Sequence, residues 1–284
     1  MSMRFPPIPQ FVEPYPDESC YSMLCRCLVR AGMSTVKFCR DMFKNQRLMS
    51  RFLWQPFRAT DLNRWFDDTP QRMPTYLKQS CISYRYPFVG KICQSDFENW
   101  GAGEELDNGA YHKLTLVLGY RKWTKRHLYY CPECVKADRK EYGETYWHMI
   151  PQLPGVYVCP VHAVPLEESA VMLSNAWMDL NPAEYWLHDT EPRRETISYE
   201  DLRIAADSKW LMEYGWEKEI KLPELLKGMS NWEFEQAEAK ATRFTKQSNV
   251  KNDTIYHILL ANMKGKSISE FVERRTKLLP INVF

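Results

Sequence analysis

The sequence predicts a mainly α-helical protein with one small metal-binding element in the middle of the chain. Amphipathic helical patterns with polar caps fill its beginning and end, two pairs of potential metal ligands lie near its centre, and 18 Pro against 11 Gly favour frequent stops over a smooth α/β alternation. The 284 residues, 44% of them hydrophobic, suffice for a real core. We expect three regions: an N-terminal helix-turn-helix with short helices over 1–82, a metal-binding module over 83–170, and a C-terminal helical domain over 171–284 with a possible second helix-turn-helix.

The first helix is expected over residues 17–32. Asp17 is a plausible N-cap, Glu18 complements the positive end of the helix dipole, and Gly32 ends the helix. The apolar residues that recur on one face are Tyr21, Leu24, Cys25 and Leu28.

A second helix begins after the turn, capped by Ser34 or Thr35. Its apolar residues are Val36, Phe38, Cys39, Met42 and Phe43. Two short helices joined by a tight turn are typical of a helix-turn-helix, in which the second helix reads the major groove of DNA. In that case Lys37, Arg40 and Lys44 lie on one face and are the natural contacts. A plain helical hairpin with a solvated basic face fits the pattern equally well.

Further helices are expected on both sides of the central motif, with residues 83–108 irregular. The expected ranges are 46–57, 59–68, 73–82 and 109–119 before the motif, and 199–214, 222–229, 232–246, 253–263 and 267–278 after it.

Charge is unevenly distributed along the chain. There are 38 basic and 36 acidic residues, so the net charge of +2 excludes a uniformly basic nucleic-acid binder. Basic side chains nevertheless cluster over 34–58 and 109–130, whereas acids dominate over 166–206. Clustered cations can neutralise phosphates. The candidate DNA contacts are Lys37, Arg40, Lys44, Arg47, Arg51, Lys122, Lys125 and Arg126.

The sharpest motif is YYCPECV followed by YVCPVHAVPL, in the pattern C-x2-C-x24-C-x2-H. The four candidate ligands are Cys131, Cys134, Cys159 and His162. Zinc prefers four such ligands in a tetrahedron, and two residues between ligands allow both side chains of a pair to converge on one ion. A closed set of four leaves no position for water, so the sequence predicts a zinc-ribbon or zinc-knuckle element that holds one structural Zn²⁺ ion.

The sequence of this motif also fits other interpretations. The first pair could be a redox dithiol, or Cys159 could be a core residue and His162 an ordinary surface histidine. His148, between the two pairs, could replace a ligand, donate a hydrogen bond near the metal or simply pack. The remaining cysteines lie at helical spacings and are interpreted as core: Cys20, Cys25, Cys27, Cys39, Cys81 and Cys93.

The sequence contains no Walker A loop and no GxSxG, HExxH or GxGxxG motif. The adjacent acid pairs Asp67-Asp68 and Glu104-Glu105 point in different directions and cannot form a carboxylate dyad by themselves. We therefore expect a binding protein and not an enzyme; a metal-dependent nucleic-acid enzyme is the less favoured alternative.

Three segments resemble the TniQ/TnsD family, over roughly residues 6–170. They are PYPDESCYSMLCR near the start, YPFVG at 86–90 and YCPECV…YGETYWH…LPGVYVCPVHAVPL at 130–166. The similarity is closer to TnsD than to the shorter TniQ proteins. TnsD proteins usually continue through further DNA-binding helices, whereas this chain stops at Phe284, and TniQ proteins of guided systems often carry further cysteine knuckles, none of which follows His162.

The resemblance implies a non-catalytic target-site selector of TnsABC-type transposons. Such a protein binds double-stranded DNA at an attachment site and recruits the AAA+ regulator TnsC, which directs the transposase. Alternatively, it bridges an RNA-guided CRISPR effector ribonucleoprotein to TnsC as a scaffold without reading DNA. The family's zinc ligands correspond to Cys131, Cys134, Cys159 and His162.

No secretory signal or membrane-spanning stretch is visible in the sequence. We expect a cytoplasmic, nucleoid-associated bacterial protein without a membrane partner.

Overall fold

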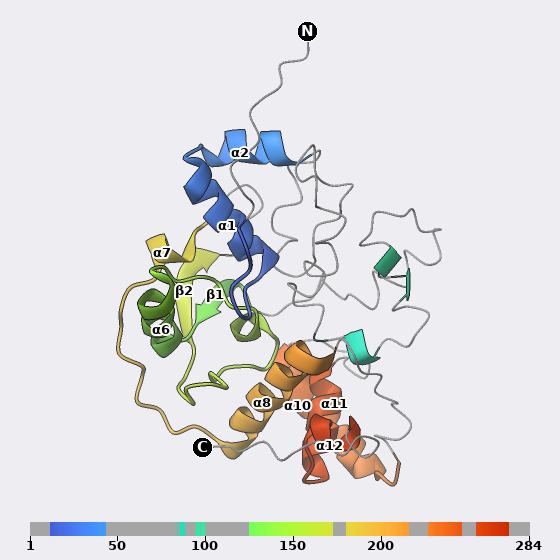
Figure 1. Ribbon diagram of the computed structural model, residues 1–284. Helices are drawn as coiled ribbons and strands as arrows, with labels where there is room; N and C mark the ends of the chain where they lie inside the picture. The colour runs from blue at the N-terminus through green and yellow to red at the C-terminus, as the bar shows by residue number, and fades with distance from the viewer. Residues whose placement is uncertain are drawn as a thin grey trace.

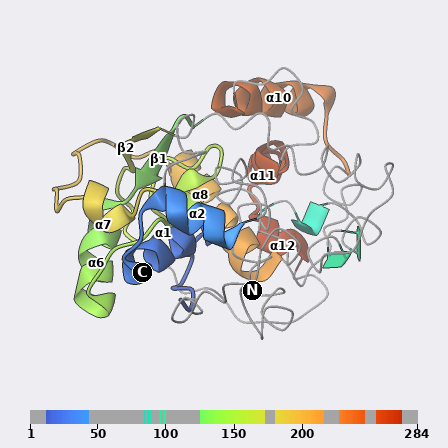
Figure 2. The same ribbon diagram turned by 90° about the horizontal axis from the view of Figure 1, so that it is seen from above.

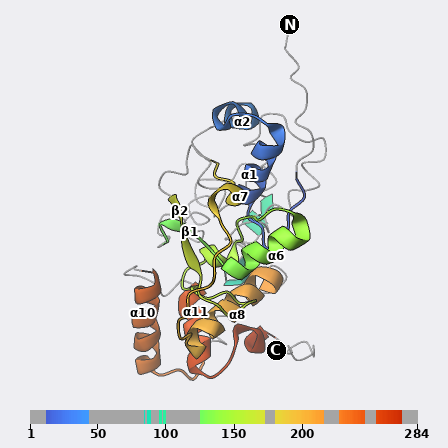
Figure 3. The ribbon, with the colours of Figure 1, turned by 90° about the vertical axis from the view of Figure 1, so that its left-hand side faces the viewer.

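A computed structural model gives the fold (Figure 1). The structure describes residues 12–43, 84, 86–88, 95–96, 98–99, 125–172, 180–215, 227–245 and 254–272. Figures 1 and 3 both show α1 and α2 at one end, a small sheet with α6 and α7 in the middle, and α8, α10, α11 and α12 at the other end. The expected mainly helical fold class is confirmed.

Helices α1 (Cys20–Ala31) and α2 (Thr35–Met42) form the N-terminal end of the described molecule. Ser34 caps α2 through a hydrogen bond from the Lys37 N–H to its side chain, and Gly32 ends α1 in the left-handed conformation, as expected. The expected N-cap of α1 was wrong, because Ser19 and not Asp17 accepts the capping hydrogen bond, from the Ser22 N–H. Asp17 has a φ of 58° and holds a distant loop instead.

The middle layer contains the only two strands within the described ranges, β1 (His127–Tyr130) and β2 (Glu167–Met172), which pair antiparallel. Between them lie α6 (Pro132–Tyr142) and a 3₁₀ turn, η6 (Ile150–Gln152), and α7 (Ala183–Trp186) follows. The fully buried Gln152 amide closes the outer edge of β1, since its oxygen accepts from the Tyr129 N–H and its nitrogen donates to the Tyr129 carbonyl. A side chain thus satisfies backbone groups that a third strand would otherwise pair.

The C-terminal end comprises α8 (Tyr199–Tyr214), α10 (Asn231–Thr245), α11 (Thr254–Met263) and α12 (Ile268–Val272). Figure 2 shows α10 lying along one side of this group. The side facing α11 carries Ala237 and Ala241, both fully buried, which allow the two helices to approach closely. Asp207 of α8 accepts a hydrogen bond from the Ile268 N–H and thereby fixes the start of α12.

The expected helices over 199–214, 232–246 and 253–263 agree with α8, α10 and α11 to within a residue at each end, and the described part of 267–278 is α12. The expected helices over 46–57, 59–68, 73–82 and 109–119 lie outside the described residues. Of the helix expected over 222–229, only 227–229 are described, and they form a turn with Gly228 at a φ of 74°, so the prediction was wrong for these residues. The short 3₁₀ turn η4 (Tyr86–Phe88) falls in the segment expected to be irregular. The proposed boundaries near residues 82 and 170 stay predictions.

The hydrophobic core runs through all three layers and includes Trp147, Phe38 and Leu24, each essentially without exposed surface. The core continues into the C-terminal helices next to Gly155. The backbone of Gly155 lies close to Ile204 of α8 and Ile255 of α11. No helix within the described part of the chain is long and apolar enough to cross a membrane.

Candidate metal centre

Each of the two predicted ligand pairs sits on a tight backbone turn. Cys131 is the N-cap of α6, Pro132 occupies the first helical position, and Cys134 lies in the first turn. On the opposite side, Cys159 accepts a hydrogen bond from the His162 N–H at its sulfur and from the Ala163 N–H at its carbonyl. Both turns therefore direct their two side chains toward one point.

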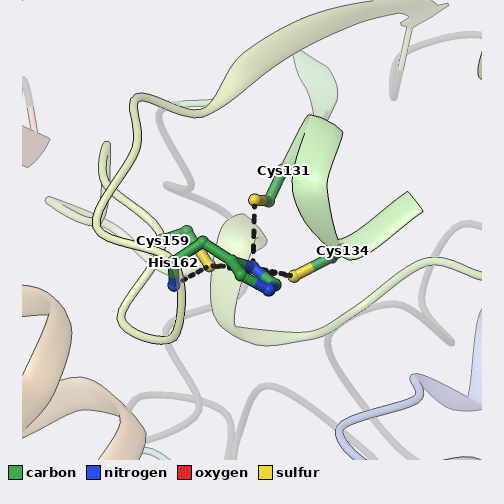
Figure 4. A group of neighbouring side chains, drawn as sticks. All are labelled: Cys131, Cys134, Cys159 and His162. Carbon is green, nitrogen blue, oxygen red and sulfur yellow. Dashed lines mark hydrogen bonds between the residues drawn. The ribbon is translucent and has the colours of Figure 1, made fainter. Parts of the chain in front are cut away.

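The four side chains converge on one point between α6 and the second turn (Figure 4). The Nδ1 atom of His162 lies 3.6 Å from the Cys131 sulfur, 3.3 Å from the Cys134 sulfur and 3.6 Å from the Cys159 sulfur. The sulfurs of Cys134 and Cys159 are 3.7 Å apart. All four ligand atoms lie within 4.8 Å of one another.

The four individual distances, 3.3–3.7 Å, match a tetrahedral zinc site. With Zn–S near 2.3 Å and Zn–N near 2.0–2.1 Å, tetrahedral angles place sulfurs about 3.8 Å apart and sulfur and nitrogen about 3.6 Å apart. A disulfide requires sulfurs near 2.05 Å. The donor set is thus spaced for an ion between the sulfurs, and three sulfurs with one imidazole nitrogen suit zinc.

Hydrogen bonds within the cluster determine which of its three thiols loses its proton first. Thiol hydrogen bonds from Cys131 and Cys134 lower the pKa of Cys159, and the N–H groups of His162 and Val161 act in the same direction. A thiolate is the form in which cysteine binds metal. Hydrogen bonds within the cluster and burial raise the pKa of Cys131 and Cys134, so an ion must displace the protons of these two thiols when it binds.

His148 does not belong to this ligand set, because both of its nitrogens face carboxylates. Nε2 lies 2.9 Å from Asp138 Oδ2, and Nδ1 lies 3.6 Å from Asp17 Oδ2. The imidazole ring stacks on Tyr146 with 4.2 Å between centroids. Of the roles considered for His148, ligand replacement is therefore not supported, whereas packing and hydrogen bonding are observed.

Burial lowers the pKa of His148, but hydrogen bonds and charges from Asp138 and Asp17 outweigh it and raise the pKa to about 10. The unfolded pKa is near 6.5, so protonation of His148 stabilises the fold fully below pH 6.5, and this contribution is lost as the pH rises through 10. Near the ring, Glu18 joins His148 in a backbone bridge, and Glu213 adds negative charge at Asp17.

We therefore expect the stability advantage of the wild-type chain over His148→Gln to shrink by about 1.4 kcal/mol per pH unit between pH 7 and 10. Urea unfolding of both proteins at several pH values measures this difference. A difference that stays constant up to pH 10 contradicts a charged His148.

The candidate DNA contacts comprise exposed residues, residues outside the described ranges and the buried Lys125. Lys37 and Arg40 are exposed on α2, with Arg40 Nε 3.5 Å from Asp41, and Arg126 is exposed before β1. The positions outside the described residues are Lys44, Arg47, Arg51 and Lys122.

The structure does not place Lys125 on an exposed surface, because the residue is only 5% exposed. Its ammonium group donates to the carbonyls of Pro151 and Val156 and lies over the rings of Tyr129 and Tyr157. A cation held in this way supports the loop before the second ligand pair and does not reach a phosphate.

The sequence interpretation missed a set of charged side chains that join the first helix to the metal module. Arg26 of α1 binds Glu18 at 2.6 Å and Glu144 at 3.0 Å, and its guanidinium lies 3.5 Å from the ring centre of Tyr15. Burial raises the pKa of Glu18 to about 7, against the opposing charge of Arg26. Glu18 and Arg26 stand in the motif PYPDESCYSMLCR, so the resemblance pointed to these positions without revealing their partners.

Comparison with known proteins identifies related chains. A family model described as TniQ matches residues 9–166, more than half of the chain. The transposon Tn7 transposition protein TnsD of Escherichia coli is 28% identical over 154 residues, which cover 54% of this chain and 30% of that relative. The chain thus matches less than a third of the relative's length. The matched family segment contains α1, α2 and all four residues of the metal cluster, and on this evidence the chain belongs to the TniQ family.

Proposed function

We propose that the protein is a non-catalytic adaptor that selects target sites in DNA transposition. The observation that carries this proposal is the TniQ match, which spans both the N-terminal helix pair and the metal cluster. The similarity to a Tn7 transposition protein supports the same process. In this role the chain binds target DNA and recruits an AAA+ regulator of the TnsC type, which directs the transposase.

The metal centre in this proposal is structural. Cys131, Cys134, Cys159 and His162 hold one Zn²⁺ ion, and a closed set of four protein ligands leaves no position for a reacting water. The ion supplies folding energy to a module whose sheet, among the residues that the structure describes, has only two short strands. The chain itself holds the two ligand-bearing turns in place. Helix α6 holds the turn with the first ligand pair, and the backbone bridge between Val158 and Pro165 holds the turn with the second pair.

DNA binding is proposed for the exposed face of α2, which offers Lys37 and Arg40. We expect the double charge reversal Lys37→Glu/Arg40→Glu to weaken binding to duplex DNA by about tenfold or more at moderate salt and to flatten its salt dependence, because phosphate contacts release counterions. Fluorescence anisotropy over a salt series measures both effects.

The matched control is Lys140→Glu/Arg194→Glu, which reverses two exposed charges elsewhere and should leave the affinity nearly unchanged. Equal losses in both double variants would indicate a general charge effect and contradict a specific role of α2.

The alternative function is a scaffold that bridges an RNA-guided CRISPR effector to the AAA+ regulator without reading DNA. One observation favours it: the burial of Lys125 removes a cation from the candidate DNA surface. The charge reversal separates the two functions when transposition is also measured in cells. A DNA reader loses site-specific insertion with Lys37→Glu/Arg40→Glu, whereas a scaffold retains it.

A further inference from the structure

Three side chains from distant parts of the sequence form a charged clasp between the first helix and the metal module. The clasp consists of Asp17, Asp138 and His148, with the imidazole between the two carboxylates. The His148 side chain is 18% exposed, and that of Asp138 is 7% exposed. A cation between two carboxylates at such low exposure is screened only weakly by solvent.

On the metal side, the clasp is attached to α6. Cys131 and Cys134 fix the first turn of this helix, and Asp138 follows Cys134 by four residues, on the same side of the helix. Asp138 Oδ2 accepts hydrogen bonds from both His148 and Thr145. A change in the direction of α6 therefore moves the carboxylate that holds His148.

On the other side, the clasp is attached to the start of α1. Asp17 Oδ2 accepts from the Ile150 N–H at 3.1 Å, and the Asp17 carbonyl accepts from the Met149 N–H at 2.8 Å. Asp17 adopts a φ of 58°, a conformation that non-glycine residues rarely hold without support. Two residues later, Ser19 caps α1 and donates its N–H to the Trp147 carbonyl.

A second connection between α1 and the metal module does not involve the clasp. Arg26 binds Glu18 and Glu144, and the latter lies beyond the end of α6 in the loop that leads to Trp147. This ion pair joins α1 to the loop, whereas the clasp joins it to the helix that carries two metal ligands.

We propose that His148 is a positioning residue that transmits the state of the metal centre to helices α1 and α2. This inference rests on the proposed zinc site and goes beyond it, because it assigns the ion a role in placing the candidate DNA-binding helix pair. Metal binding orders the first turn of α6, Asp138 orients His148, and His148 holds Asp17 at the start of α1. Loss of the ion then loosens α1 and α2 before the C-terminal helices.

Hydrogen exchange of the full chain, followed by mass spectrometry with and without a zinc chelator, tests this. We expect chelation to speed exchange in peptides from 20–31 and 35–42 by about tenfold or more, while a peptide from 254–263 changes little. In His148→Gln, the N-terminal peptides should exchange faster even with zinc bound, and chelation should add little. A purely structural histidine would not reduce the response to the metal.

The matched control is His188→Gln, because His188 is exposed and should leave the wild-type response intact. Asp17→Asn provides a second variant that changes no residue of the metal module and should also uncouple α1, so the test stands even where His148→Gln folds poorly.

Zinc content is measured in the same samples, so that a failure of the coupling can be distinguished from a failure of the zinc site. Two results contradict the coupling but not the zinc site. In the first, the protein contains zinc but chelation does not change exchange in its α1 peptides. In the second, exchange increases uniformly, including in 254–263. A wild-type chain that binds no zinc contradicts both. Unchanged coupling in both clasp variants contradicts the role of His148.

Discussion

A chain with Cys134 replaced by serine is expected to lose its zinc and the ordered structure around residues 127–172. Cys134 is half-buried, so the substitution removes a ligand with little direct effect on core packing. Structural zinc contributes about 10–16 kcal/mol of binding free energy in small zinc domains, and a missing thiolate forfeits a large part of it. We expect bound zinc to fall from about one ion to below about 0.1 per chain against a competing chelator, with a loss of more than about 4 kcal/mol in the free energy of unfolding. Elemental analysis and urea unfolding measure the two quantities.

Cys25→Ser is the matched control because it alters a buried cysteine of α1 that lies outside the cluster. It should lower stability through core packing but keep one zinc per chain. Retention of full zinc by Cys134→Ser would show that the four side chains do not form the site. Equal loss of zinc in both variants would instead indicate that any destabilisation releases the ion.

The helices were predictable where local signals agree with tertiary packing. Helix α8 runs from Tyr199 to Tyr214, as expected, because Ser198 offers a strong N-cap and the helical pattern is long. The start of α1 was misplaced because Asp17 and Ser19 are both good caps in sequence. Only tertiary contacts to Ile150 and His148 draw Asp17 away from the helix.

The metal cluster was predictable because its ligand spacing is imposed by local turns. The contacts around it were not, since they join residues more than 100 positions apart, such as Arg26 and Glu144. The contacts of Lys125 were not predictable for the same reason. Its neighbouring cations in the sequence suggested a phosphate contact, but the carbonyls that bind it come from a loop 26 and 31 residues away. The short strands β1 and β2 likewise depend on partners about 40 residues apart.

Replacement of Gly155 by alanine is expected to separate the C-terminal helices from the metal module. A Cβ at this position would lie 2.6 Å from Ile255 Cδ1 and 3.1 Å from its Cγ1, and Ile255 is fully buried. The φ of 75° adds backbone strain for any residue with a Cβ. We expect a loss of about 3 kcal/mol in the free energy of unfolding, measured in urea, from overpacking and strain together.

Two comparison variants divide this loss into its causes. Gly143 also has a positive φ, of 79°, but a Cβ there meets nothing within 4 Å, so Gly143→Ala should cost only the backbone strain of about 1 kcal/mol. Ile255→Val removes the Cδ1 atom that the new Cβ would strike, at a cost of about 1 kcal/mol by itself. In Gly155→Ala/Ile255→Val the two losses should therefore be clearly less than additive, because the shorter side chain makes room for the Cβ. Additive losses, or equal costs at Gly143 and Gly155, would mean that the close approach of this loop to α11 does not hold the C-terminal helices against the metal module.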